Sequence, residues 1–122
     1  MDRRPLHSVV ETPEFQRRAG GRLVRREIDR FIDYIAANPD AGEVMTGTGG
    51  ARKVRWAAQG RGKSGGVRSI TFYSGPPVPV FLLTVFGKSE KSNISPPERN
   101  ELRNILKDLV SKYLESVKER AR

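Results

Sequence analysis

Two basic side chains, Lys53 and Arg55, are separated by one residue in a short segment of alternating character. In a β-strand this spacing places both on the same face, because successive side chains point to opposite faces. Arg68 lies in the next apolar segment, and Lys88 directly follows a third. Cations that converge from neighbouring strands can hold phosphate groups and stabilise negative charge that develops on them. We therefore expect a site for a polyanion, with RNA as the first candidate.

The positive charge of the chain is concentrated in residues 44–88. This segment contains seven of the 23 Lys and Arg residues and none of the 14 Asp and Glu residues, so most of the net charge of +9 resides here. The seven are Arg52, Lys53, Arg55, Arg61, Lys63, Arg68 and Lys88. Because the same segment has the clearest strand patterns, it indicates a cationic sheet face and favours a nucleic-acid partner.

Composition excludes several other kinds of site. The chain has no cysteine, which rules out disulfides and thiolate metal ligands, and its single histidine, His7, rules out mechanisms that need two. The 122 residues suffice for one domain. We expect it over residues 6–119, between a polar leader (1–5) and a tail (120–122). With no signal peptide or membrane span in the sequence, we expect a cytoplasmic location, no membrane contact, and neither metal nor cofactor.

The N-terminal third predicts a strand followed by two helices. Residues 6–11 have the apolar content of a short strand. Thr12 before Pro13 is typical of a helix start, with Thr as the N-cap and Pro in the first turn, and a pair of glycines soon interrupts this helix. A longer helix is expected over residues 21–37, whose apolar residues recur every three or four positions.

The rest of the chain predicts three consecutive strands and a final helix. The expected ranges are 52–57, 67–73 and 79–86 for the strands and 96–118 for the helix, which opens on a capping box. The glycine-rich segment 43–50 is expected to form a turn, because it lacks the Lys-Ser/Thr pair of a P-loop. The last strand is almost continuously apolar, as a strand covered on both faces should be.

These elements predict an α+β fold. Consecutive strands with short links should pair as antiparallel neighbours, which gives a small, mostly antiparallel sheet of about four strands. The N-terminal helix pair and the C-terminal helix are expected to pack on one face, leaving the other face for the cations. Alternation assigns Val54 and Trp56 to the core, although Trp56 could instead stack on a nucleobase. The glycine-rich connection 59–66 is expected to form a cationic hairpin loop.

Three motifs occur in order along the central part of the chain. They are GTGGARKVR at residues 47–55, GRGKSGGVR at 60–68 and FLLTVFGKSE at 81–90. Together they resemble the RelE/ParE superfamily of bacterial toxins, and within it the HigB-type toxins. The resemblance covers roughly residues 7–118, and the order of the expected elements agrees with it. Any one motif alone would be a weak signal.

The resemblance implies the toxin of a type II toxin–antitoxin system with a RelE-like fold. It implies a metal-independent endoribonuclease, an mRNA interferase that cleaves mRNA in the A site of the 70S ribosome and inhibits translation. In such a reaction the 2′-OH of the RNA attacks the adjacent phosphate and leaves a 2′,3′-cyclic phosphate and a 5′-OH. The implied partners are the ribosome with its mRNA and a cognate antitoxin. The antitoxin is expected to carry a helix-turn-helix, through which alone operator DNA would be contacted.

Cleavage of this kind needs a base, charge stabilisation and an acid. Like-charged neighbours, Arg52 and Arg55, disfavour the protonated amine of Lys53, which makes Lys53 a candidate general base. The resemblance assigns transition-state stabilisation to Arg68 and a second basic position to Arg55. Lys88 is a candidate for phosphate contact or for protonation of the leaving group. RNA-binding roles are expected for Arg52, Arg61, Lys63 and Tyr73.

Two departures from the family pattern leave the acid–base assignment open. RelE toxins have a tyrosine near the position of Ser95 in this chain, and some HigB-type toxins have a histidine where Lys53 stands. Tyr73 or Phe86 could supply an aromatic contact to RNA, although each is more typical of a core residue.

Two other functions are compatible with the same fold. One is a ParE-like toxin that poisons DNA gyrase by binding, although such toxins generally lack the set of catalytic cations. The other is a noncatalytic module that binds RNA or the ribosome.

Overall fold

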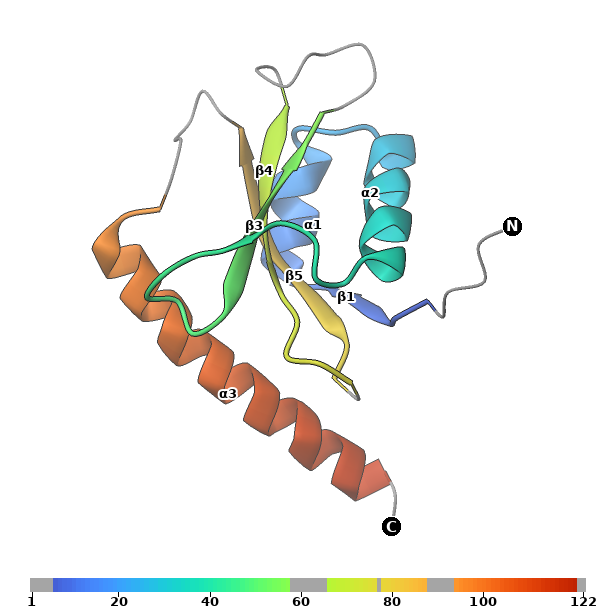
Figure 1. Ribbon diagram of the computed structural model, residues 1–122. Helices are drawn as coiled ribbons and strands as arrows, with labels where there is room; N and C mark the ends of the chain where they lie inside the picture. Colours follow the sequence, from blue (N-terminus) through green and yellow to red (C-terminus); the bar gives the residue numbers. More distant parts are fainter. Residues whose placement is uncertain (1–5, 58–65, 77, 88–93, 121–122) are drawn as a thin grey trace.

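One five-stranded sheet organises the chain. The computed structural model describes residues 6–57, 66–76, 78–87 and 94–120 (Figure 1). The strand order is β1-β5-β4-β3-β2, and the described residues form three helices around the sheet. The strands are β1 (Val9–Glu11), β2 (Glu43–Val44), β3 (Ala51–Trp56), β4 (Val67–Phe72) and β5 (Val80–Gly87). The helices are α1 (Pro13–Gly20), α2 (Arg25–Ala37) and α3 (Pro96–Arg120). The expected α+β class is confirmed.

The three central strands pair in antiparallel fashion, as expected for consecutive strands with short links. The edges of the sheet are two short strands, of which β1 runs parallel to β5 and β2 antiparallel to β3. The sheet therefore has five strands where about four were expected. The extra strand, β2, falls in the segment 43–50 that was expected to be only a turn. A strand of two residues is too short to show the alternation by which strands are recognised.

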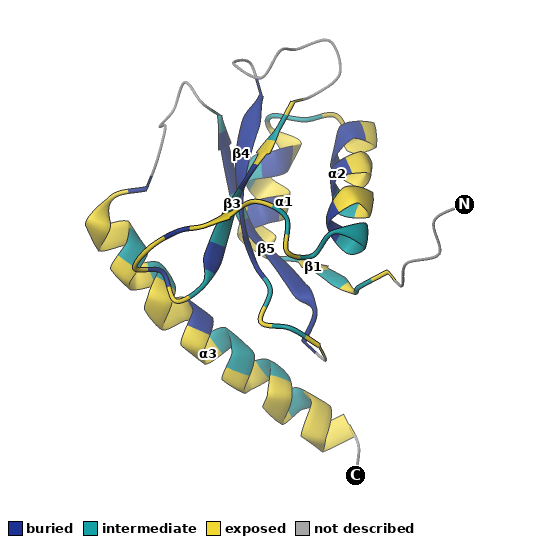
Figure 2. Ribbon diagram, in the orientation of Figure 1, coloured by how far each residue is buried: buried dark blue, intermediate teal, exposed yellow. Residues whose placement is uncertain are grey.

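The helices α1 and α2 cover one face of the sheet. Their buried residues face it in Figure 2, where the sides of both helices turned to the strands are dark blue. This layer of the core consists of Phe15, Ala19, Ile28, Phe31 and Ile35 from the helices and Val54, Val67, Val80, Leu82 and Val85 from the strands. The helix pair was predicted from the sequence, although α2 begins at Arg25 and not at residue 21 as expected.

The helix α3 covers the opposite face, so the expectation that all helices share one face is wrong (Figure 1). Leu106 of α3 is buried with Ile70, Phe81 and Phe86 of the sheet. The reason lies in the central strands, because every residue of β4 is buried and β5 is apolar on both faces. Both faces must therefore be removed from water, which needs a helical layer on each side.

Both predicted helix starts are confirmed by their caps. Thr12 accepts a hydrogen bond from the N–H of Phe15 (3.2 Å), and its hydroxyl donates to the carbonyl of Leu82 (2.8 Å). Ser95 and Glu98 form the expected reciprocal capping box, with N···O distances of 2.8 and 3.3 Å. The Thr12 side chain thus both starts α1 and fastens it to β5.

Candidate nucleic-acid interface

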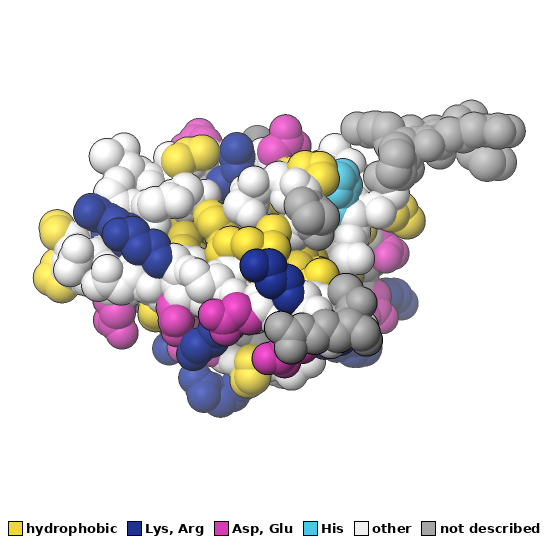
Figure 3. All heavy atoms as spheres, turned by 90° about the horizontal axis from the view of Figure 1, so that it is seen from below, with side chains coloured by type: hydrophobic (Ala, Val, Ile, Leu, Met, Phe, Trp, Pro, Cys, Tyr) yellow, Lys and Arg dark blue, Asp and Glu magenta, His cyan; other side chains and the backbone are white. Residues whose placement is uncertain are grey.

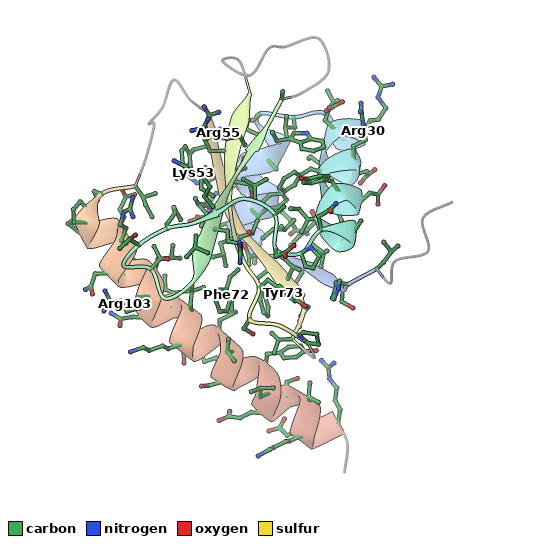
Figure 4. All side chains as sticks on the ribbon, viewed as in Figure 1. Arg30, Lys53, Arg55, Phe72, Tyr73 and Arg103 are labelled. Atoms are coloured by element: carbon green, nitrogen blue, oxygen red, sulfur yellow. The ribbon has the colours of Figure 1, made fainter. Side chains whose placement is uncertain are left out.

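Three of the four predicted catalytic cations lie together on the α3 face of the sheet. The register of β3 and β4 places Arg55 directly opposite Arg68, and Lys53 opposite Ile70. Directly paired residues share a face, with Cβ atoms about 5 Å apart. In Figure 4, Lys53 and Arg55 project from β3 toward the same side of the sheet. The structure therefore brings Lys53, Arg55 and Arg68 into one group, called here the cationic triad.

Arg68 is the buried member of the cationic triad, with 8% of its surface exposed. Its neighbours on this face include Ile70 on its own strand and Phe86, its partner on β5. Among the described residues, no carboxylate forms an ion pair with any member of the triad. A guanidinium removed from water without a protein counter-ion is costly, and a bound anion lowers that cost. The arrangement therefore suits a phosphate group.

One acidic residue lies beside the triad. The pairing of β2 with β3 places Glu43 directly opposite Lys53 on the same face of the sheet. Glu43 is exposed, and the structure records no ion pair between the two side chains. A phosphate is repelled by this carboxylate, so its favourable approach is from the β4 side, toward Arg55 and Arg68. Sequence patterns did not reveal Glu43, because β2 itself was not expected.

Two of the predicted RNA-binding residues lie on the other side of the sheet. Arg52 alternates with Lys53 and donates from Nη1 to the carbonyl oxygens of Asp40 (2.9 Å) and Gly42 (3.4 Å). Tyr73 packs against the core beneath α1 and α2, with its ring centroid 5.4 Å from that of His7 at an angle of 71°. The structure does not bring either residue to the cationic triad.

The two other aromatic candidates are engaged inside the protein. Trp56 packs edge-on to Phe31, with ring centroids 5.3 Å apart, and tilted against Tyr34 at 5.5 Å. The prediction that Trp56 belongs to the core is therefore confirmed. Phe86 is 1% exposed and belongs to the layer beneath α3.

The remaining candidates, Arg61, Lys63 and Lys88, lie outside the described residues, and their expected roles stay predictions. The same applies to most of the connection 59–66.

Two arginines of α3, which the sequence did not single out, hold the loop that precedes β3. Arg99 donates from Nη1 to the carbonyl of Thr46 (2.8 Å). Arg103 donates from Nε and Nη2 to the carbonyl of Gly47, at 3.3 and 3.2 Å. These contacts couple the position of α3 to the strand that carries Lys53 and Arg55. Nothing in the sequence marks these two among the several basic residues of α3.

The loop itself is a folded turn around Thr48, as the glycine pattern predicted. Thr48 is fully buried, and its hydroxyl donates to the carbonyl of Met45 (2.7 Å) and accepts from the N–H of Ala51 (3.0 Å). Gly47, Gly49 and Gly50 of this loop have positive φ, a region that suits glycine. Because Ala51 is the first residue of β3, the turn fixes where that strand begins.

Fold and site define a small basic α+β domain in which three cations are grouped on one face of the sheet. Over residues 14–121 the chain matches the family model described as the RelE toxin of the RelE / RelB toxin–antitoxin system. The chain therefore belongs to the RelE toxin family. It is the toxin of a toxin–antitoxin system, and a cognate antitoxin is its partner. Membership also supports a general endoribonuclease role. In the part of the chain that the structure describes, no helix could span a membrane.

Proposed function

We propose that this chain is a ribosome-dependent endoribonuclease of the HigB type. It cleaves mRNA in the ribosomal A site without a metal ion and thereby inhibits translation in the cytoplasm. The observation that carries this proposal is the cationic triad, in which a buried arginine and two further cations share one face without a described carboxylate bound to them. Such a group suits a phosphate that gains negative charge during the reaction.

In the proposed reaction, Lys53 is the general base that takes the proton of the 2′-OH. The 2′-oxygen forms a bond to the adjacent phosphorus, and the bond from phosphorus to the 5′-oxygen breaks. Arg55 and Arg68 stabilise the dianionic phosphorane between these two events, because a planar guanidinium fits two phosphate oxygens at once. The departing 5′-oxygen takes a proton, for which Lys88 is the candidate donor. The products are a 2′,3′-cyclic phosphate and a 5′-OH.

The register of the triad supports this division of roles. Arg55 and Arg68 are directly opposite each other, so one phosphate can contact both. Lys53 lies two residues from Arg55 on the same face, about 7 Å along the strand. A 2′-OH and its neighbouring phosphate are adjacent groups of one nucleotide, so a base at this separation can act on the hydroxyl while the arginines hold the phosphate.

Primer extension on mRNA after brief expression of the chain tests the proposal. Cuts between the bases of codons in translated regions are expected, and they should disappear when translation initiation is blocked beforehand. An Arg68→Ala variant should leave the same mRNAs intact. DNA damage with intact mRNA would contradict the proposal in favour of a gyrase poison, and stalled ribosomes without cuts would indicate a noncatalytic ribosome-binding module.

A further inference from the structure

The turn at residues 45–50, which leads into β3, is built to receive a side chain of α3. Arg103 donates two hydrogen bonds to one carbonyl of this turn, that of Gly47, and in Figure 4 it lies where α3 passes the turn. A Cβ atom on Gly49 would lie 3.2 Å from Cγ of Arg103, so a larger residue there would press against α3. Gly49 also has a φ of 79°, a region that suits glycine. The glycine pattern of the turn thus leaves room for the stem of Arg103.

Apolar packing buries little of α3. Of its 25 residues, all of them described, Leu106 is the one that is buried, and four further apolar residues pack against the core while partly exposed. Ile105 and Leu114 are exposed, and Figure 3 shows hydrophobic side chains among charged ones on the underside of the molecule, where α3 runs. Hydrogen bonds from charged groups are roughly twice as strong as those between neutral groups. The contacts of Arg99 and Arg103 with the turn are therefore a major part of what places α3 on the sheet.

The same turn fixes the start of β3 and with it the position of Lys53. Ala51 closes the turn, since its N–H donates to the hydroxyl of Thr48 and its carbonyl accepts from the N–H of Met45. Ala51 is also the first residue of β3 that pairs with β4. Lys53 follows two residues later, about 7 Å along the strand. A displacement of the turn would therefore move Lys53 relative to β4, the strand that carries Arg68.

We propose that Arg103 is a positioning residue for the cleavage reaction. Its hydrogen bonds to Gly47 hold the turn against α3, and the turn holds Lys53 in place relative to Arg68. Arg103 acts through the turn and does not itself touch the RNA. A misplacement of about 1 Å at a reacting group can cost about 10²-fold in rate, so a restraint at this distance affects the reaction. The inference rests on the proposed function, because it presupposes that the cationic triad acts on RNA.

Three substitutions at Arg103 separate its hydrogen bonds from its charge. Nε2 of a glutamine occupies the same position along the side chain as Nε of an arginine, which here lies 3.3 Å from the carbonyl oxygen of Gly47. Arg103→Gln can therefore keep one hydrogen bond without the charge. Arg103→Lys keeps the charge without a nitrogen at that position, and Arg103→Ala keeps neither. Lys107→Gln is the control, because it removes a cation one turn further along α3 for which the structure records no hydrogen bond or ion pair.

Single-turnover cleavage on purified ribosomes, measured over a range of ribosome concentrations, gives the rate at saturation and the half-saturating concentration separately. Arg103→Ala is expected to lower the rate at saturation about tenfold and to leave the half-saturating concentration unchanged. Arg103→Gln should recover most of the rate, and Lys107→Gln should match the wild type.

Three outcomes of this experiment would overturn the proposal. The first is a wild-type rate in Arg103→Ala. The second is recovery by Arg103→Lys but not by Arg103→Gln, with a raised half-saturating concentration in the variants without the charge, which would show that Arg103 contacts RNA. The third is a loss of rate that only follows the folded fraction, as determined by urea unfolding, because Arg103 would then serve stability alone.

Amide hydrogen exchange of the free protein tests the coupling without the ribosome. Arg103→Ala should speed up the exchange of the Met45 and Ala51 N–H groups at least about tenfold and leave the amides of α2 near wild type, because only the turn loses its restraint. Unchanged exchange at the turn, or faster exchange throughout the chain, would contradict the coupling. If the turn responds as expected while even Arg68→Ala cleaves normally, the proposed function is wrong. The role of Arg103 in cleavage then falls with it, although the contact between α3 and the turn stands.

Discussion

Arg55 and Arg68 lie directly opposite each other on β3 and β4, although like charges in this position destabilise an antiparallel pair. Arg68 is also buried, which adds the cost of desolvating its guanidinium. Selection for stability alone would favour apolar or oppositely charged residues at these two positions. The pair therefore lowers the stability of the free protein. A phosphate bound between the two guanidinium groups would offset this loss.

Replacement of Arg68 should separate function from stability. Arg68→Leu is expected to lower the rate of mRNA cleavage by about 10²–10³-fold, as the loss of a group that stabilises a transition state does. The same change should raise the free energy of unfolding by about 0.2–1 kcal/mol, because it removes a cross-strand repulsion. Urea unfolding with and without sulfate checks this, since sulfate should stabilise the wild type more than the variant. A variant that cleaves normally would contradict the role of Arg68.

The role of Lys53 can be resolved by comparing two substitutions. Lys53→Ala removes both the charge and the amine. Lys53→Arg keeps a positive charge, but on a guanidinium group that does not lose its proton in proteins. If Lys53 is the general base, both variants should lose at least about 10²-fold in single-turnover cleavage on ribosomes. Restoration of the rate by arginine would show that the position needs only charge. Glu43→Gln is a third variant for this comparison. It removes the carboxylate opposite Lys53 and leaves the Lys53 amine in place.

Binding of single-stranded RNA should depend strongly on salt. Each neutralised phosphate contributes roughly −0.7 to the slope of log K against log salt concentration. Removal of Arg55 or Arg68 should therefore reduce the slope by about 0.7. Arg26→Ala is the control, because this exposed cation lies on α2, on the opposite side of the sheet. Equal losses of slope in all three variants, measured by fluorescence anisotropy, would indicate a nonspecific basic surface.

The turn around Thr48 should be essential for stability. Thr48→Val preserves the shape but leaves the carbonyl of Met45 and the N–H of Ala51 without their partner. The expected loss is about 2–4 kcal/mol in the free energy of unfolding. Thr48→Ser keeps the hydroxyl and should cost only about 1 kcal/mol for the lost methyl group. Urea unfolding of the two variants checks this, and similar losses in both would mean that packing, not hydrogen bonding, holds the turn.

Sequence patterns predicted most of the elements, because their signals are local. The starts of α1 and α3 follow from Thr12 with Pro13 and from Ser95 with Glu98, whose hydrogen bonds join residues three positions apart. The central strands follow from alternation and apolar runs. By contrast, β2 was not predicted, because a strand of two residues is too short to show an alternating pattern. Its place in the sheet depends on its pairing with β3.

The side of the sheet on which α3 packs was predicted wrongly for a related reason. An amphipathic pattern shows that a helix buries one stripe, but not which surface it meets. The near-continuous apolar character of β5 did indicate cover on both faces, and the complete burial of β4 shows that this indication was the stronger one.

The sequence alone determined the excess of cations between residues 44 and 88 and the lack of cysteine. It also determined the order of most strands and helices along the chain. Only the tertiary structure decided which cations lie together. Strand register added Arg68 to the face that Lys53 and Arg55 already share by their spacing, and the fold gave the guanidinium of Arg52, on the other face, backbone carbonyls to bind. The physical reason is that a side chain's neighbours are set by pairing between distant segments, and that pairing is fixed by the burial of both sheet faces together.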